Sequence, residues 1–172
     1  MVAVVVPFGS VAGIGLYQLS QVCYQMGGFK ITAFDRKNLY MDIAIRIVNK
    51  SFLKLTVKSY DLNFYLNGVK VSNSKNEVPK EIIPEATSTL TTTISVAFKE
   101  TFGALKSAEM IANFATQQYD KITLSVDGVF KVKLLGAPLT VKLKQTEWTW
   151  TLADILEMMK KPSVPCPPTT KP

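Results

Sequence analysis

Hydrophobic and polar positions alternate with a period of two along the stretch from Leu39 to Asn67. This alternation predicts β-strands with one face in the core and the other in water. The hydrophobic positions are odd-numbered through Val57 and even-numbered from Tyr60. The pattern therefore changes phase near Lys58-Ser59, and one extra residue there, a β-bulge, keeps both halves on the same core.

Turn signals and further alternating segments extend this pattern over most of the chain. Asn67-Gly68 lies between two alternating segments, which is a strong signal for a β-hairpin. Gly27-Gly28 predicts a break before the first strand. Further strands are predicted at residues 29–33, 86–98, 122–126, 130–134, 139–143 and 148–152, and a short helix at 154–161.

The hydrophobic period changes to three and four between Thr101 and Gln117. This spacing predicts an amphipathic helix of about four turns, with Thr101 as its N-cap. The apolar stripe that defines it contains Phe102, Leu105, Ala108, Ala112 and Ala115.

Roughly seven short strands with one inserted helix predict a mainly β protein, an antiparallel β-sandwich. We divide the chain into an apolar N-terminal anchor or assembly arm at residues 1–28, the sandwich at 29–153, and a short helix with a Pro-rich tail at 154–172.

The N-terminal stretch has no charged side chain before Lys30. Three interpretations remain open for it: a membrane-embedded helix, an arm buried against other subunits or an ordinary N-terminal core segment, and a cleaved signal or other segment. Gly9 and Gly13 form a GxxxG pattern, which is typical of closely packed helices in membranes. The residues assigned to membrane or assembly contacts are Val4, Val5, Val6, Phe8, Gly9, Gly13, Ile14 and Leu16.

Composition argues against most catalytic chemistry. The chain contains no histidine, the commonest general base and metal ligand, and it has only two cysteines, Cys23 and Cys166. No nucleophile with a base, no paired carboxylates in a cleft and no phosphate-binding loop can be assembled. We expect no catalytic residue, no cofactor and no metal site.

Two groups of residues are candidates for binding. The net charge is +7, and Lys131, Lys133, Lys142 and Lys144 are expected on the wet face of two successive strands, as a patch for an anionic partner. A solvated face is the alternative interpretation, and no aromatic side chains alternate with these lysines as single-stranded nucleic acid would require. Trp148 and Trp150 share a face, as core residues or as interface aromatics.

The segment from Asp42 to Phe98 resembles a known family. It contains IAIRIVNKS, LTVKSYDLNFYLNGVKVS and IIPEATSTLTTTISVAF, and this order is similar to the LEA14-like, or water-stress and hypersensitive-response (WHy), domain. Lys50 stands where that family usually has proline after the asparagine. The resemblance implies a fibronectin-III-like sandwich without enzymatic activity. Proteins of this type with an apolar N-terminal segment are also similar to ones encoded by bacteria and phages.

These observations lead to three functional hypotheses. The first is a non-catalytic structural or interaction protein, anchored by its N-terminus in a membrane or a multi-subunit particle, with a phage virion component as its particular form. The second is a desiccation- or stress-protective protein. The third is nucleic-acid binding through the lysine patch, which the missing aromatic residues disfavour. Other protein subunits and a lipid bilayer are therefore the expected partners.

Overall fold

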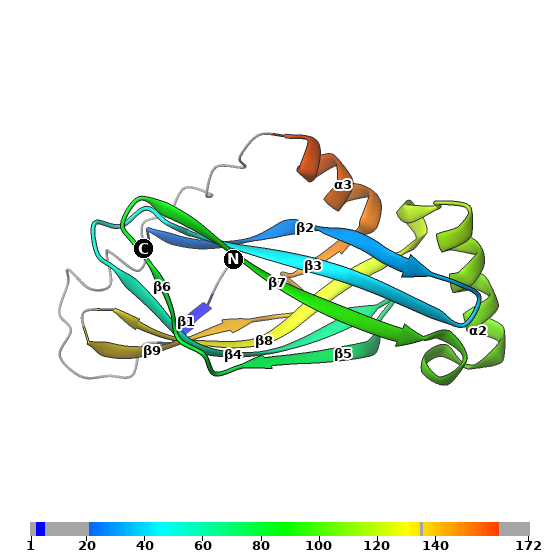
Figure 1. Ribbon diagram of the computed structural model, residues 1–172, viewed down its shortest axis with the longest axis horizontal. Helices are drawn as coiled ribbons and strands as arrows, with labels where there is room; N and C mark the ends of the chain where they lie inside the picture. Colours follow the sequence, from blue (N-terminus) through cyan, green and yellow to red (C-terminus); the bar gives the residue numbers. More distant parts are fainter. Residues whose placement is uncertain (1–2, 6–20, 135, 162–172) are drawn as a thin grey trace.

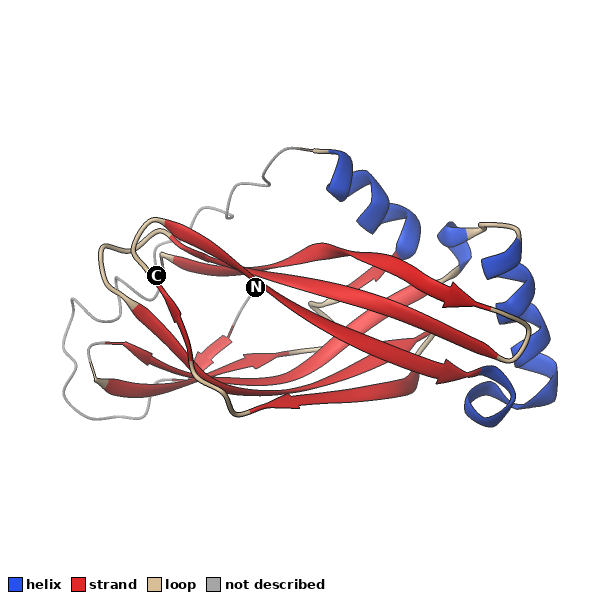
Figure 2. Ribbon diagram, in the orientation of Figure 1, coloured by secondary structure: helices blue, strands red, loops and turns tan. Residues whose placement is uncertain are grey.

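The computed structural model describes residues 3–5, 21–134 and 136–161. They form two antiparallel sheets that pack face to face, with one helix at the end of the sandwich and another beside its smaller sheet (Figures 1 and 2). The strands are β1 (Ala3–Val5), β2 (Val22–Phe34), β3 (Asn38–Asn49), β4 (Leu55–Leu66), β5 (Val69–Asn76), β6 (Lys80–Ile82), β7 (Ala86–Ala97), β8 (Thr123–Leu134), β9 (Ala137–Leu143) and β10 (Thr149–Thr151). The helices are α2 (Phe98–Ala115), the 3-10 turn η1 (Tyr119–Lys121) and α3 (Leu152–Lys160).

The strand order confirms the predicted antiparallel β-sandwich with an inserted helix. The larger sheet runs β1-β9-β8-β4-β5, with β10 paired to β8 and β6 paired to β4. The smaller sheet runs β2-β3-β7. Since β3 precedes β4 and β6 precedes β7, the chain crosses between the two sheets at these connections (Figure 1).

The alternation in β3 and β4 places one continuous hydrophobic core between the sheets. In β3 the odd-numbered side chains from Leu39 to Ile47 are buried. In β4 the pairing with β8 shifts by one residue between Val57 and Ser59, which confirms the predicted bulge. The buried residues of β4 are accordingly Leu55 and Val57 before the bulge, then Leu62, Phe64 and Leu66 after it.

The hairpin between β4 and β5 turns at Asn67 and Gly68, as predicted. Their φ angles are 47° and 78°, and two positive values in succession favour Asn-Gly over other residue pairs. The Asn67 side chain also accepts a hydrogen bond from the Thr123 amide at 2.7 Å. The turn therefore holds the start of β8 in place.

The inserted helix differs from its prediction in both its start and its buried face. It begins at Phe98, its N-cap is Ala97 without a side-chain cap, and Gly103 interrupts it with φ 75° and ψ 174°. Thr101 is therefore not the N-cap. The interruption changes the phase of the helix, so most of the predicted stripe faces solvent and Leu105 is 90% exposed, while Phe102 packs against the core. The alanines at 108, 112 and 115 are exposed too, and the buried side chains are instead Phe98, Ser107, Met110, Asn113 and Phe114.

The expected break at Gly27-Gly28 was wrong, because both glycines lie inside β2. The register of β2 against β3 shifts between Met26 and Gly28, so the glycines form a bulge within the strand. A Cβ atom on Gly28 would lie 2.9 Å from the sulfur of Met159 in α3, which packs on this strand. Residues 22–28 therefore belong to the smaller sheet, and the predicted boundary at residue 29 falls inside β2.

The C-terminal helix begins slightly earlier than predicted. Thr151 caps it in a reciprocal capping box with Asp154, and the helix proper starts at Leu152. Leu152 and Ile155 are buried, so α3 is part of the sandwich rather than an appendage. The Pro-rich tail lies outside the described residues.

A buried asparagine joins the two crossings between the sheets. Asn49 is 0% exposed. Its side-chain amide donates to the carbonyl oxygens of Leu53 at 2.8 Å, Ile82 at 3.2 Å and Ile83 at 3.3 Å. Its Oδ1 accepts from the hydroxyl of Ser51 at 2.6 Å and from the amide of Ser51 at 3.1 Å. In the sequence Asn49-Lys50-Ser51, the side chains of Asn49 and Ser51 are therefore both engaged in hydrogen bonds inside the protein.

Replacing Asn49 by Ala removes these bonds, so the carbonyl oxygens of Ile82 and Ile83 lose this donor and Ser51 loses its acceptor, while the Leu53 carbonyl keeps the Ser51 hydroxyl at 3.0 Å. We expect the free energy of unfolding to fall by at least about 3 kcal/mol, since each buried unsatisfied group costs about 1–3 kcal/mol. Urea unfolding measures this loss. The matched control is Asn38→Ala at the other end of β3, expected to stay within about 0.5 kcal/mol of wild type. Equal effects of the two substitutions would contradict a special role for Asn49.

Gly128 lies where β8 approaches β4 too closely for a side chain. A Cβ atom there would meet the backbone oxygen of Asp61 at 2.1 Å, and φ is 138°. We expect Gly128→Ala to destabilise the protein by more than about 3 kcal/mol, since overpacking adds to backbone strain. Gly136→Ala is the control, because φ is 81° and nothing lies within 4 Å. Thermal and urea unfolding should show a loss of only about 1–2 kcal/mol there.

Candidate functional site on the outer face of the large sheet

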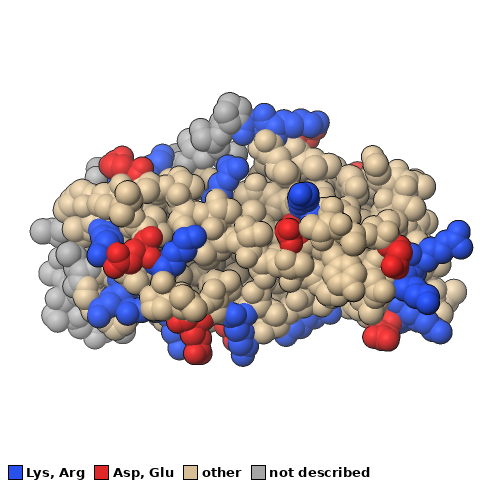
Figure 3. All heavy atoms as spheres, viewed as in Figure 1, with Lys and Arg blue, Asp and Glu red and all other residues tan. Residues whose placement is uncertain are grey.

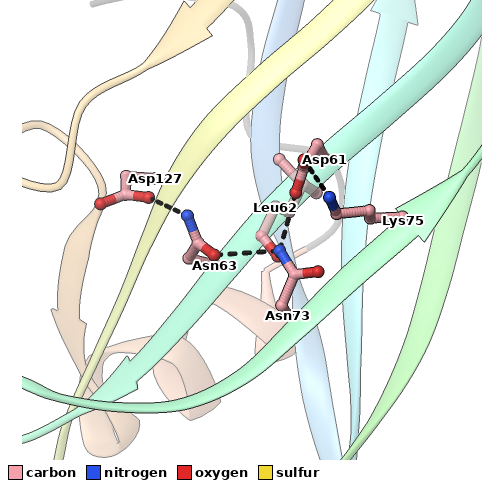
Figure 4. A network of polar contacts seen from close by, with 6 residues as sticks. All are labelled: Asp61, Leu62, Asn63, Asn73, Lys75 and Asp127. Atoms are coloured by element: carbon pink, nitrogen blue, oxygen red, sulfur yellow. Dashed lines mark hydrogen bonds and ion pairs between the residues drawn. The ribbon is translucent and has the colours of Figure 1, made fainter.

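The outer face of the larger sheet carries a row of hydrogen-bonded polar side chains across three strands. Asn73 of β5 donates to Asn63 Oδ1 of β4 at 2.9 Å, and Asn63 donates to Asp127 Oδ1 of β8 at 2.8 Å (Figure 4). The Tyr65 hydroxyl donates to the other oxygen of Asp127 at 2.8 Å. The cause is the register, which sets Asn63 opposite both Asn73 and Asp127. We call these residues, together with Asp61 and Lys75, the polar ladder.

Asp61 lies at one end of the polar ladder and is held in its ionised form. It accepts a hydrogen bond from Asn73 at 2.7 Å and pairs with Lys75 at 3.0 Å (Figure 4). The Asn73 hydrogen bond and then the Lys75 contact lower the pKa of this carboxyl below its usual value. The hydrogen bond to Asp127 raises the pKa of the Tyr65 hydroxyl. Both shifts keep each group in its ordinary charge state at neutral pH, the opposite of what general acid–base chemistry needs.

A shallow depression of about 490 Å³ lies beside the ladder. Asp61, Asn63, Asn73 and Lys75 contribute to its wall, together with Lys70, Gly128 and Val129. Most of the polar groups in that wall already have partners within the ladder. The described residues contain no group of three or more carboxylate or thiol side chains placed to hold a metal ion.

The four lysines predicted as a patch do share one face. Lys131 and Lys133 lie on β8, Lys142 on β9 and Lys144 just after it, and all four are exposed. Lys131 is opposite Thr140 and Lys142 is opposite Val129, so Lys131 and Lys142 are diagonal neighbours across the two strands.

The bulge in β4 adds a fifth lysine that sequence reasoning missed. Lys58 is the extra residue between Val57 and Ser59, it is exposed, and Ser59 is opposite Lys131. The change of phase in the sequence marked this position, but only the pairing with β8 shows what lies beside it. Figure 3 shows basic side chains, with acidic ones between them, along the lower margin of the molecule, where the outer face of the larger sheet is seen edge-on. We call Lys58, Lys131, Lys133, Lys142 and Lys144 the lysine face.

The two tryptophans lie largely inside the protein. Trp148 is only 3% exposed and belongs to the core, and Trp150 is half-buried. Their rings meet edge to face at 5.3 Å. The structure therefore places Trp148 among the core residues rather than among the interface aromatics.

Only part of the predicted N-terminal contact set lies among the described residues. Val4 and Val5 belong to β1, which pairs with β9, with Val4 opposite Val141 and Val5 opposite Thr140. Val6, Phe8, Gly9, Gly13, Ile14 and Leu16 lie outside the described residues. Within the described part of the chain, no helix has the length and apolar character needed to span a bilayer.

Comparison with known proteins identifies similar folds only. No family model and no curated protein matches the chain. Among solved structures, the chain is similar to a protein from Archaeoglobus fulgidus, with 14% identity, a TM-score of 0.40, and coverage of 76% of this chain and 94% of that one. It is also similar to a protein from Arabidopsis thaliana, with 8% identity, a TM-score of 0.43, and coverage of 70% and 75%. Likeness at this level carries no argument about activity.

The lowered pKa of Asp61 makes its contribution to stability depend on pH. A carboxyl whose pKa is lower in the folded state stabilises the protein above its unfolded pKa of about 3.9, and that contribution is lost as the pH falls through the folded pKa. As the pH is lowered from about 5 to about 2, the free energy of unfolding should therefore fall less for Asp61→Asn than for wild type. Urea unfolding across this range measures the difference. Identical acid dependence of the two proteins would contradict this role for Asp61.

A carboxyl-detected NMR titration tests the cause of that shift. Asn73→Ala and Lys75→Gln should each raise the pKa of Asp61, because the Asn73 hydrogen bond and the Lys75 contact both lower it. Asp35 is the internal control. The backbone amides of Lys37 and Asn38 lower its pKa, so neither substitution should change it.

Proposed function

We propose that this chain is a non-catalytic structural or interaction module, held by its apolar N-terminal stretch at a membrane or in a multi-subunit particle. The observation that carries the proposal is β1. It pairs Ala3–Val5 with β9 and so ties the uncharged stretch to an edge of the larger sheet, next to the strand that carries Lys142. The sandwich then presents its outer face to a partner.

The polar residues support binding rather than chemistry. Asp61 and Asp127, the acidic members of the polar ladder, are each hydrogen-bonded to neighbouring side chains. The chain has no histidine to act as a base near neutral pH. Cross-strand polar pairs of this kind stabilise a sheet by about 0.2–1 kcal/mol each and so rigidify the face that contains them.

The LEA14-like resemblance supports the same class of protein. Its two most specific features are the strand that ends in Asn49 and the Asn67-Gly68 hairpin. Asn49 organises the crossing between the sheets, and Asn67 and Gly68 form the turn with positive φ angles. We propose a phage virion component as the particular form, since the resemblance extends to such proteins with apolar N-terminal segments.

Charged substitutions in the N-terminal stretch test the anchoring proposal in the full chain. Ile14→Asp with Leu16→Asp should move the protein from the membrane or particle fraction to the supernatant, because charge opposes apolar burial. The matched control is Leu105→Asp on α2, since Leu105 is 90% exposed and far along the sequence from that stretch. Thermal unfolding checks that both variants remain folded. If the double variant stays in the membrane or particle fraction as wild type does, the proposal that the N-terminal stretch is an anchor is refuted.

A further inference from the structure

We infer that the lysine face is a docking site for an anionic lipid bilayer surface. This inference deepens the proposed function by naming the partner that one face of the sandwich contacts. It rests on four observations: the lysines have no ion-pair partner among the described residues, the lysines outnumber the acids near them, the lysines lie on one sheet face, and residues 3–5 of the apolar stretch join that sheet at a neighbouring strand.

The lysines of this face are exposed and uncompensated. None of the five forms an ion pair or a side-chain hydrogen bond with another described residue, whereas Lys54, Lys75 and Lys160 each pair with an acid. Solvated lysines are common on sheets. Five of them, from β4, β8, β9 and the residue just after β9, outnumber the acids beside them, which are Asp61, Asp127 and Glu81, and so make a local excess of positive charge that attracts anions.

Two of the acids nearest to this face belong to the polar ladder, and a third, Glu81, pairs with Lys54. Asp61 faces Val129 across the sheet and pairs with Lys75 on its other side. Asp127 accepts hydrogen bonds from Asn63 and Tyr65. Asp61 is therefore compensated by Lys75, whereas Asp127 keeps its negative charge, and the five lysines still leave an excess of positive charge on this face.

The shape of the array fits a plane better than a strand of nucleic acid. Alternate residues on a β-strand are about 7 Å apart, and neighbouring strands are about 4.8 Å apart. The five lysines therefore form a two-dimensional array, and all of them project from the same face of the sheet. Between them lie Ser59, Val129 and Thr140, which offer no ring for a base to stack on. Tyr65, the nearest aromatic residue of the ladder, has its hydroxyl bonded to Asp127.

The position of β1 favours a bilayer over a free anion. β1 pairs with β9, so residues 3–5 of the uncharged N-terminal stretch lie beside Lys142. A basic surface next to an apolar segment supplies two signals for membrane attachment, and stable attachment generally needs two. Each lysine near an anionic surface contributes about a fivefold increase in affinity.

Vesicle binding of the full chain tests the inference. Wild type should bind vesicles of 70% phosphatidylcholine and 30% phosphatidylserine more tightly than vesicles of phosphatidylcholine alone, and added NaCl should weaken the difference. The variant Lys131→Gln, Lys133→Gln, Lys142→Gln should lose about 100-fold in affinity for the anionic vesicles. The matched control is Lys37→Gln, Lys99→Gln, Lys106→Gln, three exposed lysines near or in α2, which should bind like wild type. Lys58→Gln alone should lose about fivefold.

Each contrary outcome overturns the inference in a distinct way. Equal binding to both vesicle types, or equal losses in the two triple variants, would show that the lysine face is not the site. Binding to duplex DNA that the first triple variant loses, without binding to vesicles, would assign the face to nucleic acid. Absence of vesicle binding, together with particle association that Ile14→Asp and Leu16→Asp abolish, would overturn this inference and leave the proposed function standing.

Discussion

The sandwich depends on one buried side chain where the chain crosses from sheet to sheet. Both β3–β4 and β6–β7 cross at the same end, and buried backbone carbonyls there need hydrogen-bond donors. Asn49 donates to carbonyls on both connections, at Leu53 and at Ile82 and Ile83. A single amide therefore links the two connections at this end of the sandwich, and the alternation in β3 and β4 fills the space between the sheets with one hydrophobic core.

Local patterns predicted those parts of the fold that local rules determine. The phase change near Lys58 predicted the bulge because the inward face of β4 has to stay continuous. Asn67-Gly68 predicted the hairpin because few other residue pairs accept two positive φ angles. In both places the physical constraint acts within a few residues, so the sequence alone was sufficient.

The errors arose where long-range packing decided between local options. Glycines at 27 and 28 suggested a break, but pairing with β3 and packing against Met159 make them a bulge within a strand. Spacing suggested that Leu105 is buried, but the interruption at Gly103 and the packing of Phe98 against Phe114, with ring centres 6.1 Å apart, turn that face outward. The sequence predicted four lysines on one face. The fifth, Lys58, could be assigned to that face only from the pairing of β4 with β8.

At the bulge in β4, the number of residues in the strand is constrained, but the identity of the side chain at position 58 is not. The backbone of β4 requires a residue at position 58, because deleting one would turn either Val57 or Leu62 away from the core. The side chain at that position is exposed and meets no such constraint. Evolution can therefore change the charge presented at this point by substitution while the hydrophobic core stays intact, but it cannot shorten the strand there without rebuilding the sandwich.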